Sequence, residues 1–188
     1  MASGLAIFLV ANETKAGARS GFPLQPIKGR DVNSNKTGTA LQLEQFLPYR
    51  LSVLANTVSN ALSGVYRERF GLTIPDWRLI AVLARFPGSS AQALVDHTRM
   101  DKVAISRSVA RLETRGLITR ELSESDRRSF KLVLTAEGEA IYRDIVPLAR
   151  ALESELEKGL DPEERARLDD LLGRLQAVAD TLGTAADN

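Results

Sequence analysis

The sequence predicts a mainly α-helical chain with one small β-hairpin, an α+β arrangement. Apolar residues recur at steps of three and four over most of residues 43–183, which is the period of an amphipathic helix. Within that region, Phe130, Leu132 and Leu134 alternate with their neighbours, as in a strand with one buried face. Glycine and proline interrupt the helical period at several places, so several helices are expected.

These interruptions divide the chain into its expected elements. In order, they are helices at 43–70, 75–86, 90–98 and 101–115, strands at 118–122 and 129–134, and helices at 136–158 and 162–182. Gly71 and Gly116 follow two of the helices, where a left-handed residue commonly ends a helix. This order is that of a winged helix-turn-helix with helical extensions at both ends.

Residues suited to helix N-termini mark where several helices begin. Ser89-Ser90-Ala91-Gln92 fits a capping box for the third helix, and Asp101 can cap the fourth. Pro75 suits the first turn of the second helix. Asp161-Pro162-Glu163-Glu164 combines a cap, a proline and an acidic first turn at the start of the last helix.

Composition limits the possible chemistry. A chain of 188 residues can form one domain with appendages. It has no cysteine, which excludes disulfides, thiolate metal sites and thiol nucleophiles, and its one histidine makes a zinc site unexpected. Neither a Gly-rich phosphate loop nor a nucleophile elbow is present. We therefore expect no enzyme activity, no metal and no cofactor.

The net charge of +1 conceals segments of opposite sign. Residues 99–134 hold nine Lys/Arg against five Asp/Glu, whereas residues 135–188 hold six against thirteen. The basic middle suits contact with a polyanion, and the acidic end suits water or a partner subunit.

Residues 1–40 are predicted to form a disordered arm, because Gly, Pro and polar residues interrupt any helical period there. The apolar run at 5–11 is too short for a secretion signal and lacks a basic segment before it. Nowhere does the sequence approach the roughly 20 apolar residues that a membrane span needs. We expect a cytoplasmic protein with no membrane partner.

The helix at 101–115 has two distinct faces on a helical wheel. The face expected to meet the core carries Ile105, Val109, Leu112 and Gly116. The opposite face carries Val103, Arg107, Ala110, Arg111 and Thr114. Small and basic residues on the outward face suit a helix that lies in the major groove of DNA, where arginine can donate two hydrogen bonds to guanine.

Recognition helices contact bases mainly through their first turns. Lys102, Val103, Ser106 and Arg107 are therefore expected to read bases. Arg111, farther along the helix, is expected to contact phosphate. The alternative, a merely solvated helix face, is disfavoured by the short helix before this one and the basic hairpin after it.

Several short runs in and after this helix resemble the signature of the MarR family of bacterial transcriptional regulators. In order, they are Ser106-Arg107, Leu112-Glu113, Arg115-Gly116-Leu117, Arg120, Asp126-Arg127-Arg128, and Leu134-Thr135 with Gly138. The resemblance covers roughly residues 43–183 and leaves the first forty or so unmatched. It implies a DNA-binding homodimer and favours repression.

The tip of the hairpin holds Ser125-Asp-Arg-Arg-Ser129, in which the Asp126 carboxylate can hold one guanidinium while another reaches outward. The family resemblance implies that a wing arginine enters the minor groove, and narrow A·T-rich grooves attract arginine. Either Arg127 or Arg128 could do so. The hydroxyl-bearing residues expected to contact phosphate are Ser89, Ser90 and Ser129.

Both helices at the end of the chain carry long apolar stripes. One stripe comprises Val146, Leu148, Leu152, Leu156 and Leu160, and the other Leu168, Leu171, Leu172, Leu175, Val178 and Leu182. A small winged lobe cannot cover both stripes, so burial against a partner is expected, with a helical cap over the monomer's own core as the alternative. The resemblance implies a two-fold dimer reading a pseudo-palindromic operator.

We therefore divide the chain into an arm at 1–40, a domain at 41–183 and a tail at 184–188. Within the domain, about 75–135 is the expected DNA-binding lobe, and 43–70 and 136–183 are the expected dimerisation helices.

Members of the resembled family often bind small aromatic or phenolic anions between the dimer helices and the DNA-binding lobe. The candidate ligand contacts in this sequence are Tyr49, Arg50, Tyr66, Trp77, Arg78 and His97. Trp77 has the alternative role of a core anchor, and His97 that of a surface or capping residue.

The expected function is a homodimeric regulator that binds double-stranded DNA sequence-specifically, acting as a repressor that a small aromatic effector releases. The alternative is a winged-helix protein-interaction module without sequence-specific DNA binding. Salt separates the two, because affinity for DNA falls steeply as the salt concentration rises.

Overall fold

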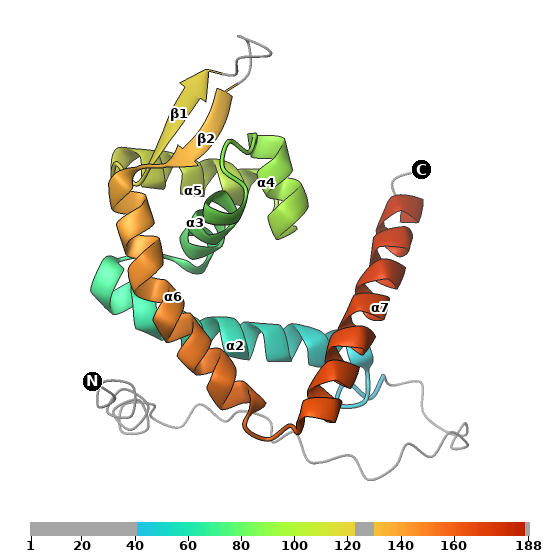
Figure 1. Ribbon diagram of the computed structural model, residues 1–188. Coiled ribbons are helices and arrows are strands. Elements are labelled where there is room, and N and C mark those ends of the chain that lie inside the picture. Colours follow the sequence, from blue (N-terminus) through green and yellow to red (C-terminus); the bar gives the residue numbers. More distant parts are fainter. Residues whose placement is uncertain (1–40, 123–129, 187–188) are drawn as a thin grey trace.

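The computed structural model describes residues 41–122 and 130–186. Its elements are α2 (Leu47–Phe70), α3 (Ile74–Arg85), α4 (Ala91–Thr98), α5 (Lys102–Thr114), β1 (Ile118–Leu122), β2 (Phe130–Leu134), α6 (Ala136–Glu157) and α7 (Pro162–Ala186). Figure 1 shows α3, α4, α5 and the hairpin gathered in one lobe, from which α2 and α6 extend. The predicted fold class, mainly α with a small β-wing, is confirmed.

Side-chain caps begin α3 and α5. Thr73 Oγ1 accepts a hydrogen bond from the Asp76 amide at 3.4 Å, and Asp76 Oδ2 accepts one from the Thr73 amide at 3.0 Å, which completes a capping box. Asp101 caps α5 as predicted, because its Oδ1 accepts from the Ala104 amide at 2.7 Å. Each cap satisfies an amide that the helix itself leaves without a partner.

The capping box predicted for the third helix is wrong in its residues. Ser90, not Ser89, is the N-cap of α4, and its hydroxyl oxygen accepts from the Ala93 amide at 3.1 Å. Gln92 donates to the Asp96 carboxylate at 3.0 Å rather than back to the cap. The helix itself spans Ala91–Thr98, close to the predicted range 90–98.

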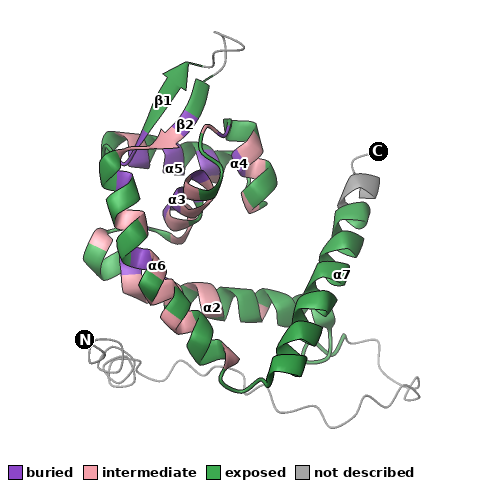
Figure 2. Cartoon of the chain, viewed as in Figure 1, coloured by how far each residue is buried: buried purple, intermediate pink, exposed green. Residues whose placement is uncertain are grey.

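The core lies between α3, α4, α5 and the base of the hairpin, where Figure 2 shows the buried residues concentrated. Its buried apolar side chains include Leu79, Ile80, Leu83, Leu94, Ile105, Val109, Leu112 and Leu132. The predicted inner face of the recognition helix is confirmed for Ile105, Val109 and Leu112. Gly116 is exposed, contrary to prediction, and its φ of 67° places it in the left-handed region just beyond the helix.

The hairpin pairs β1 with β2 antiparallel, from Ile118 opposite Leu134 to Leu122 opposite Phe130. Only part of the predicted inner face of β2 is buried: Leu132 is buried and Leu134 half-buried, whereas Phe130 is 49% exposed. The difference arises because the far end of the hairpin projects beyond the core (Figure 1).

Helix α6 starts directly against the backbone that follows α5. The Thr135 amide donates to the Leu117 carbonyl at 3.1 Å, and the Thr135 hydroxyl donates to the Gly116 carbonyl at 2.7 Å. A Cβ built on Gly138 would lie 2.1 Å from the Leu117 carbonyl oxygen. Glycine is therefore required here by close approach of two backbone segments.

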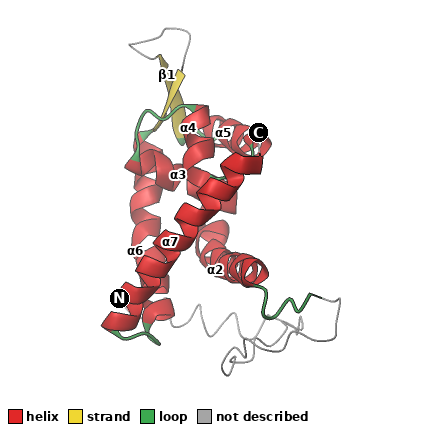
Figure 3. Cartoon of the chain, turned by 90° about the vertical axis from the view of Figure 1, so that its right-hand side faces the viewer, coloured by secondary structure: helices red, strands yellow, loops and turns green. Residues whose placement is uncertain are grey.

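Helix α7 does not cover the core of its own chain. Its residues are exposed from 162 to 182, including the whole predicted stripe from Leu168 to Leu182 (Figure 2). Figure 3 shows α7 as a separate rod crossing in front of α6. The helical cap over the monomer's own core is therefore not formed.

Within the two described ranges, no helix combines the length and apolar character that crossing a membrane requires.

The Gly138 contact generates a stability prediction. Gly138→Ala should lower the free energy of unfolding by about 1–3 kcal/mol or more, because a methyl group cannot fit against the Leu117 carbonyl without moving backbone. Urea unfolding followed by circular dichroism, at one protein concentration, measures the change.

Gly173→Ala is the matched control, since nothing lies within 4 Å of a Cβ at Gly173. It should stabilise α7 slightly, because alanine favours helix more than glycine. Equal effects of the two substitutions would contradict the close approach.

Candidate nucleic-acid interface

Of the four residues predicted to read bases, Val103 and Arg107 lie on the outward face of α5, and Lys102 and Ser106 lie on the side that lines a groove. Lys102, Val103, Ser106 and Arg107 are exposed, and Val103 keeps 56% of its surface accessible. The inner face of α5 packs against α3 and α4. The packing therefore keeps these side chains exposed on one side of the lobe.

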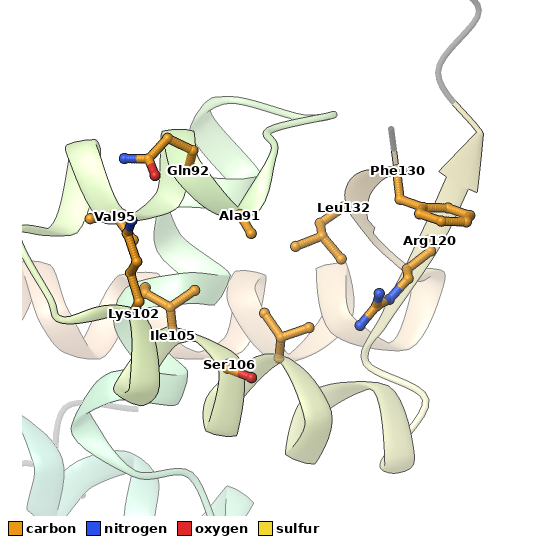
Figure 4. Close-up of a pocket in the computed structure, with 10 residues that line it drawn as sticks. Ala91, Gln92, Val95, Lys102, Ile105, Ser106, Arg120, Phe130 and Leu132 are labelled. Carbon is orange, nitrogen blue, oxygen red and sulfur yellow. The ribbon is translucent and has the colours of Figure 1, made fainter. Parts of the chain in front are cut away.

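A groove of about 460 Å³ lies beside this face, between α4, α5 and the hairpin (Figure 4). Lys102 of α5 and Arg120 of β1 lie at opposite ends of it in the view of Figure 4. Its apolar lining includes Ile105, Val109 and Leu132. The groove thus lies beside the first turns of α5, with Lys102 at one end and Arg120, which is paired with Glu113, at the other.

The two serines predicted near α4 differ in accessibility. Ser90 is exposed at the N-terminus of α4, a position suited to an anion because helix amides point outward there. Ser89 is buried, and its hydroxyl donates to the Phe86 carbonyl at 2.7 Å. The Ser89 backbone also pairs with Leu132 of the wing. Contrary to prediction, the Ser89 side chain is therefore not available to contact phosphate, because it is buried and hydrogen-bonded within the fold.

The side chain of Arg111, which was predicted to contact phosphate, is also hydrogen-bonded within the fold. Its guanidinium Nη2 donates to Asp76 Oδ1 at 2.7 Å, to Ser108 Oγ at 2.8 Å and to Thr73 Oγ1 at 3.3 Å. Its Nε lies 3.4 Å from Asp76 Oδ2. Arg111 therefore binds α5 to the start of α3, and a phosphate contact would have to compete with these bonds.

Asp76 is the buried partner of this cluster, with 2% of its side chain exposed. Burial opposes the charged carboxylate, but the hydrogen bonds from Arg111 and Thr73 outweigh it, so the pKa of Asp76 lies below its ordinary value. The carboxylate stays ionised in the folded protein. The Thr73-to-Asp76 spacing signals the cap in the sequence, but the pairing with Arg111 has no local signal.

Two more arginines serve the fold rather than the outward face. Arg115 donates hydrogen bonds to the carbonyl oxygens of Phe70, at 2.6 Å, and of Gly71, at 3.1 Å. Its guanidinium thereby caps the end of α2. Arg120 donates to both oxygens of Glu113, at 2.6 and 3.0 Å, and this pairing raises the pKa of Arg120. These bonds fix the end of α5 to α2 and to the wing.

Comparison with known proteins identifies the family. A model described as the MarR family matches residues 70–129. The HTH-type transcriptional repressor Rv2887 of Mycobacterium tuberculosis is 30% identical over 131 residues, covering 69% of this chain and 91% of the relative. The chain belongs to the MarR family.

Solved structures of MarR regulators share its fold. A MarR/EmrR family regulator from Acinetobacter sp. ADP1 has a TM-score of 0.70 and 28% identity, with 75% of this chain and 99% of that one covered. A MarR family regulator from Listeria monocytogenes, complexed with 26mer DNA, has a TM-score of 0.67, with 73% of this chain and 91% of that one covered. At 21% identity, the second likeness concerns the fold alone.

The tip of the MarR wing lies outside the described residues. Asp126, Arg127, Arg128 and Ser129 fall in the undescribed range 123–129. Their predicted contacts with the minor groove and with phosphate stay predictions.

The residues predicted to contact an effector are spread over the MarR fold. Trp77 lies between Tyr66 of α2, at 5.9 Å between ring centroids, and Tyr142 of α6, at 6.0 Å. Tyr66 is buried, and burial raises its pKa to about 12. Trp77 thus has the alternative role of a core anchor joining three helices.

The other candidates lie elsewhere. His97 stacks on Phe86, with ring centroids 4.3 Å apart, near the end of α4. Tyr49 and Arg50 are exposed in the first turn of α2, and Arg78 donates to Ser59 at 3.3 Å. None of these residues lines the groove of Figure 4, and their contact with an effector stays a prediction.

The Asp76–Arg111 pair generates a second prediction. Arg111→Met should lower the free energy of unfolding at pH 7 by about 2 kcal/mol, because it leaves a buried carboxylate without its cation. The effect is no larger because the Arg111 side chain is half-exposed, and water weakens its attraction to Asp76. Arg107→Met, which removes the same charge from the outward face, should change stability far less. Urea unfolding of both variants measures the difference.

The difference between wild type and Arg111→Met should also depend on pH. Because the folded pKa of Asp76 is lowered, its contribution is present above the unfolded value of about 3.9 and is lost as the pH falls through the folded value. The two unfolding free energies should therefore converge in acid. A difference that stays constant down to pH 2 would contradict the ion-pair interpretation.

Proposed function

We propose that this MarR family protein is a homodimeric transcriptional regulator that binds double-stranded DNA sequence-specifically through α5. The observation that carries the proposal is the exposed, cationic face of a recognition helix whose other side is bound to the lobe. In this proposal, Arg107 donates to the O6 and N7 atoms of guanine, and Lys102, Val103 and Ser106 contact neighbouring base edges.

Phosphate contacts would orient the lobe on the duplex. Ser90 supports this role, since it is exposed at the N-terminus of α4 beside the recognition helix. On sequence grounds, Arg127 or Arg128 would enter the minor groove, and Ser129 would contact phosphate. Arg111 and Ser89 are left out, because both are bonded within the fold.

Two copies of the chain would bind one operator. The exposed stripe of α7 and the exposed apolar residues at the start of α2, which include Phe46, Leu47, Leu51 and Leu54, support burial against a second copy. Residues 43–70 and 136–183 would form the dimer, with residues 75–135 as the DNA-binding lobe. A two-fold dimer places its recognition helices about 34–36 Å apart, which favours a pseudo-palindromic operator.

We further propose that the protein represses transcription and that a small aromatic effector releases it. A relative named as a repressor supports the first part. The junction at Trp77 supports the second, because it connects α2 and α6 with α3 of the lobe. An effector held near Tyr49, Arg50, Trp77 or His97 would act by favouring a dimer in which the recognition helices no longer fit successive grooves.

The proposal predicts salt-sensitive binding that depends on Arg107. The purified protein should shift DNA from its own promoter region, with an affinity that falls steeply as salt rises. Arg107→Ala should weaken this binding by about 1–3 kcal/mol and relax specificity at one base pair of each half-site. Fluorescence anisotropy with labelled duplexes at several salt concentrations measures both effects.

Arg150→Ala is the control, because it removes the same charge from an exposed position on α6, away from α5. It should leave the specific affinity nearly unchanged. If no salt-sensitive binding occurs, a protein-interaction module becomes the better interpretation.

The dimer generates a separate prediction. Ending the chain at Arg165 should convert the dimer to a monomer in sedimentation velocity, since it removes the exposed stripe of α7. The full-length variant carrying Leu171→Glu and Leu175→Glu should do the same by charging that stripe. A truncated chain that still sediments as a dimer would show that α7 is dispensable for association.

A further inference from the structure

Val103 is an apolar side chain in an unexpected environment. It lies in the first turn of α5 and is 56% exposed, whereas Ile105, Val109 and Leu112 of the same helix are buried. Valine is also a weaker helix former than alanine or lysine. Neither burial nor helix propensity within the described chain explains valine at this position.

The neighbours of Val103 place it at the centre of the proposed DNA-binding face. Arg107 follows one helical turn later and Ala110 two turns later, so the three share one face of α5. Ser106 and Ala110 are small and exposed, which lets the helix approach the groove closely. Val103 is therefore the bulky apolar group on a face otherwise made of cations and small residues.

The major groove offers one apolar partner for such a group. Thymine alone carries a methyl group there, beside its O4 acceptor, whereas the groove edges of the other bases present only hydrogen-bond donors and acceptors as their distinguishing groups. A valine placed against cytosine or adenine would leave those groups without partners, which is unfavourable once water is displaced. Contact with thymine instead buries apolar surface on both sides.

We propose that Val103 is a specificity-determining residue that selects thymine through its C5 methyl group. This inference rests on the proposed function, since it assumes that α5 enters the major groove. Four residues of helix span about 6 Å, and base pairs are about 3.4 Å apart. The thymine read by Val103 therefore lies within about two base pairs of the guanine read by Arg107.

Replacing thymine by deoxyuracil tests the contact, because this change removes the methyl group and keeps the base pair. The full-length chain first selects duplexes from a random pool, and each thymine of the selected half-site is then replaced singly. At one position, uracil should weaken binding about four-fold, the value of one buried methyl group. Replacing the other thymines near this turn of α5 should leave the binding affinity unchanged.

Val103→Ala, combined with the uracil replacement, completes a double-mutant cycle between the side chain and the thymine methyl group. It should weaken binding to the thymine duplex and be nearly indifferent to uracil at the same position, because the methyl group no longer has its partner. Thr114→Ala, an exposed change in the last turn of α5, is the matched control and should keep the wild-type response to uracil. Circular dichroism confirms that each variant is folded.

The outcomes separate the inference from the proposed function. Salt-sensitive binding to a selected sequence with no response to uracil at any position overturns the role of Val103 and leaves the DNA-binding proposal intact. A uracil response that persists in Val103→Ala also overturns it. Failure to select any duplex, or binding that salt does not weaken, overturns the proposed function and the inference together.

Discussion

The buried Asp76 carboxylate and the Arg111 guanidinium form the contact on which the lobe's arrangement depends. Asp76 completes the capping box that begins α3 and, through Arg111, binds the middle of α5. A charge with 2% exposure is tolerated only when it is paired and hydrogen-bonded, so the two helices are confined to a geometry that keeps these bonds. Arg115 adds a second connection, to the end of α2. The orientation of the recognition helix is thereby set by the α2–α3 corner.

The same corner joins the lobe to the helices proposed to form the dimer. The rings of Tyr66, Trp77 and Tyr142 pack together across α2, α3 and α6, and the hydrogen bonds of Thr135 connect the start of α6 to the backbone that follows α5. A change in the angle between α2 and α6 would therefore be passed to α5 through packed rings and backbone hydrogen bonds rather than absorbed by a loose linker. This coupling would give the proposed effector a physical route to the proposed DNA-binding face.

The arginines of this region have different partners, and these partners determine which arginines could contact DNA. Arg111, Arg115 and Arg120 hydrogen-bond to Asp76, to the end of α2 and to Glu113. Arg107 is exposed on the outward face. A count of basic residues therefore overstates how many are available to phosphate or bases. The structural pairs instead hold α5 rigidly against the lobe, so that the side chains proposed to read bases, Arg107 and Val103, keep a fixed spacing.

The sequence by itself determined the features that depend on neighbours along the chain. Helical periodicity placed α5, Asp101 capped it and Gly116 ended it, because caps and left-handed residues act over three or four positions. Alternation likewise located β2, and the outward residues of α5 followed from its period. Only the tertiary structure decided the roles of Ser89 and Arg111. The Asp76 partner of Arg111 lies 35 residues away, and the backbone of Ser89 pairs with Leu132 of the wing strand, so both assignments depend on contacts that are distant in the sequence. Long-range packing decides which polar side chains of a basic region are bonded within the fold and which remain exposed for the proposed contact with DNA.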